Sequence, residues 1–135
     1  MLPSTDEARR PPLLKASTSK RARSARPGKV TRWGIIGPGR IAGAFVCDLH
    51  LAPDAVPAAA ASRSGKRAER FARQYGLARA YEGYECLAAD PEIDVVYVAT
   101  TNASHAGPVR LCLEAGKPVV CEKPFALNAR EAASC

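Results

Sequence analysis

One short segment constrains the fold of this chain more than any other: an apolar run that ends in two closely spaced glycines. The run Trp33-Gly34-Ile35-Ile36 is typical of a buried strand. The turn Gly37-Pro38-Gly39-Arg40-Ile41-Ala42 follows directly and opens a helix that we expect over Arg40 to Leu51. Four-residue spacing predicts three apolar side chains on one face of this helix: Ile41, Phe45 and Leu49. A strand, a glycine turn and a helix in this order predict the start of an α/β fold.

The glycine turn has the residue types that the pyrophosphate of a dinucleotide needs. Gly37 permits a tight turn, and Gly39 lets the backbone approach the phosphates because it has no side chain. Ala42 stands where a third glycine is common and lets the helix pack closely on the strand. The N–H groups and the dipole of a helix N-terminus attract anions, so we also assign Arg40 and Ile41 to the predicted cofactor site. The alternative is an ordinary tight turn without a ligand.

Strand and helix patterns alternate from residue 33 to the end of the chain. Further strands are predicted over residues 56–62, 78–81, 94–100 and 119–121. Further helices are predicted over residues 66–75, 84–89, 106–115 and after Asn128, which forms a capping-box pattern with Glu131. The alanine run at 58–61 alone favours a helix, but its place in the alternation favours a strand. The order predicts a Rossmann-type, doubly wound parallel sheet with helices on both faces, incomplete at its C-terminal end.

The end of the second predicted strand bears on the choice of cofactor. NAD-binding sites usually place an Asp or Glu there to bind the ribose 2′-hydroxyl, whereas this chain has Ser62-Arg63-Ser64. Ser62 and Arg63, with Lys66 or Arg67 nearby, could instead bind a 2′-phosphate through charge-assisted hydrogen bonds. The sequence therefore favours NADP(H) over NAD(H). The alternative is that these side chains form the solvated start of a helix.

The basic charge of the chain is confined to its N-terminal region. Residues 1–32 carry the whole net charge of +7, and residues 33–135 are neutral. Residues 1–30 are rich in Pro, Ser and Arg or Lys and have no apolar periodicity, which predicts a disordered basic tail. We expect a single nucleotide-binding domain over 31–135. A nucleic-acid contact or a targeting role of the tail is the alternative to a passive segment.

Cysteine usage and hydropathy indicate the compartment. The five cysteines are scattered without metal-ligand or disulfide-framework spacing: Cys47, Cys86, Cys112, Cys121 and Cys135. We expect small buried thiols in a reducing environment and no metal site. No apolar run in the sequence approaches the roughly 18 residues that a membrane-spanning helix needs. These observations predict a soluble, cytoplasmic protein without a membrane partner.

Three segments together resemble a known family. Arg32–Ala42, Asp94–Thr100 and Cys121-Glu122-Lys123-Pro124 resemble the N-terminal half of the Gfo/Idh/MocA oxidoreductases, closest to the branch of dimeric dihydrodiol dehydrogenases and NADP-dependent sugar dehydrogenases. The resemblance covers residues 31–135. It implies an NAD(P)-dependent oxidoreductase that transfers hydride between a nicotinamide cofactor and a secondary alcohol of a sugar, polyol or dihydrodiol.

The resemblance also implies roles for individual residues. Three residues match the loop that lies along the cofactor in this family: Thr100, Thr101 and Asn102. His105 matches the histidine after that loop and is either a cofactor or substrate contact or a helix cap. Three residues match the Glu-Lys-Pro motif, whose proline often follows a cis bond: Glu122, Lys123 and Pro124. Lys123 is the predicted catalytic residue, because a cation beside the alcohol oxygen stabilises the negative charge that develops as hydride leaves. Tyr97 and the other aromatic side chains are expected in the core.

Members of the family continue into a second domain that supplies much of the substrate pocket. This chain ends at Cys135, within the helix that begins after Asn128. We therefore expect a nucleotide-binding piece that is inactive by itself, with a homo-oligomer formed only together with the missing domain. The alternatives are a non-catalytic nucleotide-binding module and a protein that contacts nucleic acid through its tail.

Overall fold

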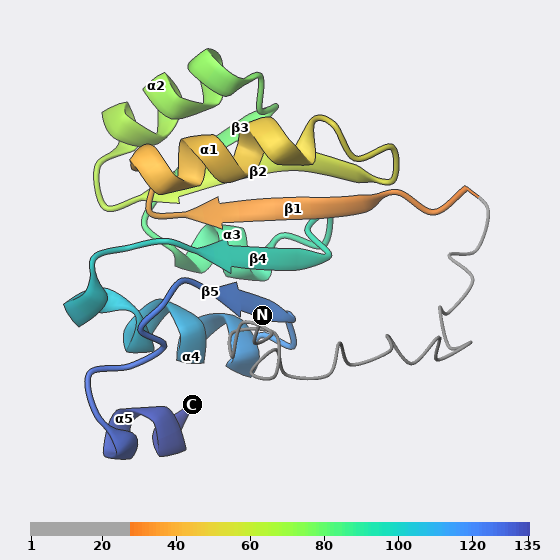
Figure 1. The fold of residues 1–135 in the computed structure, drawn as a ribbon. Coiled ribbons are helices and arrows are strands. Elements are labelled where there is room, and N and C mark those ends of the chain that lie inside the picture. The colour runs from red at the N-terminus through yellow and green to blue at the C-terminus, as the bar shows by residue number, and fades with distance from the viewer. Residues whose placement is uncertain (1–27) are drawn as a thin grey trace, which may run out of the picture.

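The computed structural model describes residues 28–135, which form one sheet with helices on both faces (Figure 1). Its elements in chain order are β1 (Thr31–Ile36), α1 (Arg40–Leu49), β2 (Ala55–Ser62), α2 (Gly65–Tyr75), β3 (Arg79–Glu82), α3 (Glu85–Ala89), β4 (Val95–Val98), the 3-10 turn η2 (Asn102–Ser104), α4 (Ala106–Glu114), β5 (Val119–Cys121) and α5 (Ala129–Ser134). The predicted tail over 1–30 lies almost wholly outside the described residues and stays a prediction. Within residues 28–135 no helix is long and apolar enough to cross a membrane.

The five strands are parallel and stand in the order β3-β2-β1-β4-β5. The chain builds outward from β1 to β3 and then crosses back to add β4 and β5 on the other side of β1. The connections that leave β1 and β4 therefore diverge, and such a point opens a crevice at the carboxyl ends of the strands. The predicted doubly wound parallel sheet is confirmed, whereas its incompleteness at the C-terminal end stays a prediction.

Each face of the sheet has its own apolar core (Figure 1). Helices α1 and α2 cover one face, where the buried residues include Ile35, Ala42, Val46, Leu49, Ala60, Phe71, Ala72 and Tyr97. Helices α3 and α4 cover the other, where they include Ile36, Ala59, Ala61, Leu87, Ala88, Val96, Val98, Val109 and Cys112. Because both faces are covered, the strands are apolar throughout rather than alternating, as the run Val95–Val98 shows.

The alanine run at 58–61 lies in β2, as its position in the alternation predicted. Ala60 faces α1 and α2, and Ala59 and Ala61 face the opposite core, so small side chains let helices approach this strand from both sides. Pro57 pairs with Trp33 of β1 at a register shift and precedes the part of β2 that pairs with β3. A proline without an N–H is tolerated there because β2 has only one neighbour at that position.

Helix α1 differs in detail from the prediction. It ends at Leu49 rather than Leu51, and it packs on the sheet through Ala42, Val46 and Leu49. The side chain of Ile41 is 59% exposed, so the predicted face through Ile41 was wrong. The helix is rotated by about one residue because the small Ala42 must face the sheet where the turn brings the backbone close to β1.

The predicted cap of α5 is confirmed, whereas the predicted burial of the cysteines is confirmed only in part. Asn128 caps α5, since its side chain accepts a hydrogen bond of 3.0 Å from the backbone N–H of Glu131. The predicted burial of the cysteines holds for Cys112, but Cys47 and Cys86 are exposed.

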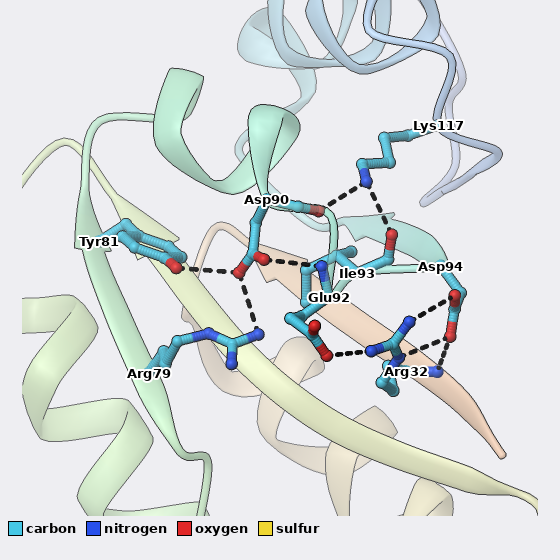
Figure 2. A network of polar contacts seen from close by, with 8 residues as sticks. All are labelled: Arg32, Arg79, Tyr81, Asp90, Glu92, Ile93, Asp94 and Lys117. Atoms are coloured by element: carbon cyan, nitrogen blue, oxygen red, sulfur yellow. Dashed lines mark hydrogen bonds and ion pairs between the residues drawn. The ribbon is translucent and has the colours of Figure 1, made fainter.

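The amino-terminal ends of the strands are joined by a polar network centred on Asp90 (Figure 2). This carboxylate is buried and accepts hydrogen bonds from the Tyr81 hydroxyl at 2.9 Å and the Glu92 N–H at 2.8 Å. Arg79 forms an ion pair with it at 2.9 Å. Lys117 donates from Nζ to the carbonyl oxygen of Asp90 at 2.6 Å. The loop before β4 is thereby tied to β3 and to the start of β5.

A second carboxylate extends the network to β1 (Figure 2). Asp94 accepts hydrogen bonds from the backbone N–H of Arg32 at 2.8 Å and from its Nε at 3.1 Å. The hydrogen bonds from Arg32 hold the pKa of Asp94 below its usual range. Because β1 and β4 are neighbours in the sheet, this pair fixes the ends at which both strands start.

We expect Asp90→Ala to lower the free energy of unfolding by about 1–3 kcal/mol. The Tyr81 hydroxyl, the Glu92 N–H and Arg79 would lose a buried acceptor that water replaces poorly. Urea unfolding followed by circular dichroism measures the change. The matched control Asp48→Ala removes an exposed carboxylate from α1 and should change the stability by less than about 0.5 kcal/mol.

The contribution of Asp90 to the free energy of unfolding should depend on pH in one direction. Burial raises the pKa of Asp90, but the hydrogen bonds from Glu92 and Tyr81 and the charge of Arg79 outweigh it and hold the pKa below the ordinary value of 3.8. The contribution of Asp90 is therefore fully present above its unfolded pKa and is lost as the pH falls through the lower folded value. The difference between parent and Asp90→Ala should narrow below about pH 4. A difference that widens on acidification would contradict this account.

Candidate functional site

A cleft of about 530 Å³ lies at the carboxyl ends of the strands, where the connections that leave β1 and β4 diverge. Four segments form it: the turn after β1, the end of β2 with the start of α2, the loop before α3, and the loop after β4. Its lining residues are Gly37, Pro38, Gly39, Ser62, Arg63, Ser64, Arg67, Tyr84, Ala99, Thr100, Thr101 and Ser104. The cleft is thus at the opposite end of the sheet from the Asp90 network.

The turn after β1 is pressed against the loop after β4. Gly37 has φ +86°, and a Cβ built on it would lie 2.6 Å from the backbone nitrogen of Thr100 and 2.7 Å from the carbonyl carbon of Ala99. Its N–H donates to the carbonyl oxygen of Ala61 in β2 at 3.2 Å. Both the conformation and the close contact require glycine here, as predicted.

Gly39 is needed for a different reason. It is exposed, and a Cβ built on it would meet no atom within 4 Å, so the space beside it is open to the cleft. It is the N-cap of α1, whose first turn carries neither a capping side chain nor an acidic residue. The N–H groups of such a first turn have no partner within the helix, and the dipole adds positive potential. An anion can therefore approach the backbone at this point.

The end of β2 and the start of α2 form a cationic wall of the cleft. Ser62 is buried and accepts a hydrogen bond from the N–H of Ser64 at 3.2 Å. The hydroxyl of Ser64 in turn accepts from the N–H of Arg67 at 3.4 Å and caps α2. These bonds place the exposed side chains of Arg63 and Arg67 along the cleft. Lys66 was considered with them in the sequence but does not line the cleft.

Tyr84 lines the cleft although no sequence pattern indicated it. It precedes α3, and its position follows from the strand order, which sets the end of β3 beside the end of β2. Ala99, Pro38 and Ser104 were also missed. The signal that could have found them is topological, since residues that follow neighbouring parallel strands gather at one edge of the sheet.

The loop after β4 is stiffened by its own hydroxyl groups. The hydroxyl of Thr100 donates to the carbonyl oxygen of Ser104 at 3.0 Å, and that of Thr101 donates to the Ser104 hydroxyl at 3.1 Å. Both threonines line the cleft, as the family resemblance implied. Asn102 starts the 3-10 turn η2 in the same loop.

His105 braces two loops from within. Its ring is 1% exposed, with Nδ1 at 2.7 Å from the carbonyl oxygen of Pro124 and Nε2 at 2.8 Å from that of Thr100. It occupies the N-cap position of α4, as one of the two predictions had it, but its side chain makes no capping hydrogen bond. Both ring nitrogens face backbone carbonyls, and the alternative prediction of a ligand contact stays a prediction. His105 ties the loop after β4 to the loop after β5.

The loop after β5 carries the three residues of the Glu-Lys-Pro motif. The N–H of Glu122 donates to the carbonyl oxygen of Val98 at 2.9 Å, which continues the pairing of β5 with β4. The peptide bond between Lys123 and Pro124 is cis, as the resemblance implied. Lys123 itself is exposed.

The structure brings together about half of the predicted site residues in the cleft. Six of them line it: Gly37, Gly39, Ser62, Arg63, Thr100 and Thr101. Arg40 and Ile41 lie beside it in the first turn of α1, and residues 122–124 follow β5 on the far side of β4. The predicted site therefore divides into a cleft over β1, β2 and β4 and an arm, residues 122–124, after β5.

These features define a class of protein. A glycine turn at the switch point of a parallel sheet, with an uncapped helix N-terminus behind it, is the site of an NAD(P)-binding Rossmann domain. The open space at Gly39 fits the close backbone approach that such a cofactor needs. The chain belongs to the Gfo/Idh/MocA family, the oxidoreductase family with an NAD-binding Rossmann fold, which residues 31–135 match. The predicted resemblance is confirmed.

Individual relatives agree with this assignment. The chain is 45% identical over 102 residues to trans-1,2-dihydrobenzene-1,2-diol dehydrogenase of Mus musculus, a match that covers 74% of this chain and 31% of the enzyme. It is similar to the structure of a 3-ketoreductase from Actinomadura kijaniata in complex with NADP, with 34% identity, a TM-score of 0.73, and 78% of this chain and 34% of that chain covered.

A third relative holds the other cofactor. The structure of myo-inositol dehydrogenase from Lactobacillus casei in complex with NAD(H) and myo-inositol matches with 28% identity, a TM-score of 0.73, and 78% of this chain and 32% of that chain covered. The chain thus spans about a third of the length of the relatives it matches.

We expect Gly37→Ala to lower the free energy of unfolding by about 2 kcal/mol or more, because it adds both backbone strain and a clash with the loop after β4. Chemical denaturation measures the loss. Gly107→Ala is the matched control in α4, where an added Cβ meets nothing within 4 Å. It should leave the stability unchanged or raise it by up to about 1 kcal/mol. Equal effects of the two substitutions would contradict the close contact at Gly37.

Proposed function

We propose that this chain is the cofactor-binding part of an oxidoreductase that transfers hydride between NADP(H) and a secondary alcohol of a small sugar, polyol or dihydrodiol. The observation that carries the proposal is the make-up of the cleft. Its lining combines the open backbone at Gly39 with two arginines, one after β2 and one in the first turn of α2, and the lining residues include no carboxylate. The dihydrodiol dehydrogenase, ketoreductase and inositol dehydrogenase named among the relatives support the class of substrate.

The preference for NADP(H) rests on charge. A 2′-phosphate is a dianion at neutral pH, and guanidinium groups bind phosphate through two parallel hydrogen bonds. Arg63 and Arg67 are both exposed to the cleft, and α2 adds a first turn without acidic residues. A ribose with a free 2′-hydroxyl carries no negative charge to pair with a guanidinium group, and an arginine cannot accept the hydrogen bond that its O–H can donate. The relatives hold either cofactor, so the preference is inferred from these side chains.

The arm after β5 would serve the other half of the cofactor. The nicotinamide ring supplies the site for hydride when the cofactor is bound. Lys123 is exposed on the arm and would hold its side-chain nitrogen beside the substrate hydroxyl. As the neutral amine it can accept the hydroxyl proton, and as the ammonium group it can return that proton and stabilise negative charge on the oxygen. The hydrogen bond from the N–H of Glu122 to the carbonyl oxygen of Val98 and the contact of His105 with Pro124 anchor the arm on both sides of Lys123.

Cofactor preference tests the first part of the proposal. Arg63→Asp should weaken NADPH binding by about 10–100-fold, because it removes charge-assisted hydrogen bonds of about 1.5–3 kcal/mol, and should leave NADH binding equal or tighter. Fluorescence titration with both nucleotides measures the ratio. Arg70→Asp makes the same change of charge on α2, but Arg70 does not line the cleft. The assignment fails if the two variants shift the NADPH-to-NADH ratio equally.

Catalysis tests the second part. Lys123→Ala should reduce kcat for oxidation of dihydrodiols or sugars by about 100-fold or more, with nucleotide affinity changed by less than about threefold. Steady-state kinetics of the enzyme that contains this domain measures both. Lys66→Ala is the control, since Lys66 is exposed and does not line the cleft. Nucleotide binding without turnover of any such substrate would instead indicate a non-catalytic binding module.

A further inference from the structure

The side chain of Tyr97 does more than fill the core. It is 2% exposed, comes from β4, and its ring stacks on that of Phe45 from α1, with centroids 3.9 Å apart and an angle of 17° between the planes. The ring of Trp33 makes an edge contact with the ring of Phe45, and the centroids of these two rings are 5.3 Å apart. The sequence predicts Tyr97 as a core residue, and its ring confirms this. Its hydroxyl, however, donates a hydrogen bond to the carboxylate of Glu122 in the arm after β5.

The hydroxyl is not needed for packing. A phenylalanine ring would make the same stack on Phe45 and bury the same apolar surface, and a buried hydroxyl costs free energy unless it is hydrogen-bonded. Burial, and then the bond to Glu122, raise the pKa of Tyr97, so the hydroxyl keeps its proton and stays a donor. The hydrogen bond therefore links the core on the α1 side to the arm.

The link to Glu122 is one of two that flank Lys123. On one side, Tyr97 holds the carboxylate of Glu122, whose N–H also donates to Val98 at 2.9 Å. On the other, the ring of His105 lies 2.7 Å from the carbonyl oxygen of Pro124. Lys123 is exposed, and each of its two neighbours in the chain is held by a buried side chain, Glu122 by Tyr97 and Pro124 by His105. The ammonium group of Lys123 makes no hydrogen bond or ion pair with another of the residues 28–135.

We propose that Tyr97 is a positioning residue, which fixes Glu122 and so holds the arm of residues 122–124 in place for the nicotinamide half of the cofactor. The inference rests on the proposed function and goes beyond it, since Tyr97 does not line the cleft. It acts on one half of the dinucleotide because the arm follows β5, while Arg63 and Arg67 lie between the end of β2 and the first turn of α2, on the other side of β1 and β4.

The test uses the separation in space between the arm after β5 and the two arginines of the cleft. Tyr97→Phe should weaken the binding of NADPH by about 5–20-fold, a part of what a lost hydrogen bond to a charged group is worth, because the bond acts on the cofactor only through the arm. It should change the affinity for adenosine 2′,5′-bisphosphate, which lacks the nicotinamide half, by less than about twofold. Isothermal titration of the chain with both ligands measures the two affinities. A merely structural role would weaken both ligands alike.

The matched control is Tyr81→Phe. It also removes a tyrosine hydroxyl that donates to a carboxylate, Asp90, but at the opposite end of the sheet. It should lower the stability to a similar extent and leave both affinities unchanged. A double-mutant cycle adds a second readout, because Tyr97→Phe should cause no further loss of NADPH affinity in a Glu122→Ala background. In a Glu122→Gln background, where an acceptor remains, it should still cause one.

The outcomes separate this inference from the proposed function. If the parent chain binds neither ligand, the proposed function fails and the positioning role of Tyr97 fails with it. If the parent binds both and Tyr97→Phe alters neither affinity, or alters both equally, the positioning role alone is overturned. An additive double-mutant cycle would also overturn it, since the two residues would then act independently.

Discussion

The site depends on one close approach, that of the Gly37 backbone to the loop after β4. There is no room for a side chain, because an added Cβ would lie 2.6 Å from the nitrogen of Thr100. This contact puts the N-terminus of α1 directly over the crevice between β1 and β4, where diverging connections leave space. The open backbone at Gly39 and the uncapped first turn of α1 can therefore meet an anion. A larger residue at 37 would move the helix away from the strands.

The polar side chains at the two ends of the sheet differ in role: those at the amino-terminal ends stabilise the fold, and those at the carboxyl ends are available for binding. At the amino-terminal ends, the carboxylates of Asp90 and Asp94 find partners within the protein and tie the strand starts together (Figure 2). At the carboxyl ends, the cationic groups of Arg63 and Arg67 face the cleft, and Lys123 is exposed. Polar groups that the fold satisfies stabilise it, and those that it leaves exposed are available to a ligand. Parallel strands make this division possible because all of them point the same way.

The arm after β5 shows how buried side chains can serve a site without lining it. His105 contacts the carbonyls of Thr100 and Pro124, and the Tyr97 hydroxyl reaches Glu122, so two interior residues hold the loops on which binding residues stand. Sequence patterns marked His105 through a family motif as either a ligand contact or a helix cap, and placed Tyr97 in the core. Neither role can be deduced from spacing, since the contacts of Tyr97 with Glu122 and of His105 with Pro124 join residues that are distant in the chain and come together only because β4 and β5 are paired.

By itself, the sequence determined the class of fold, the glycine turn and the family, because these depend on local patterns: an apolar strand, a helix start, and the alternation of strands and helices. It also marked the end of β2 through Ser62 and Arg63. Only the tertiary structure decided that Ala42 rather than Ile41 faces the sheet, that Tyr84 and Arg67 line the cleft, and that residues 122–124 form a separate arm. The physical reason is that helix rotation and the meeting of loops are set by packing between strands that are not neighbours in sequence, which no local pattern records.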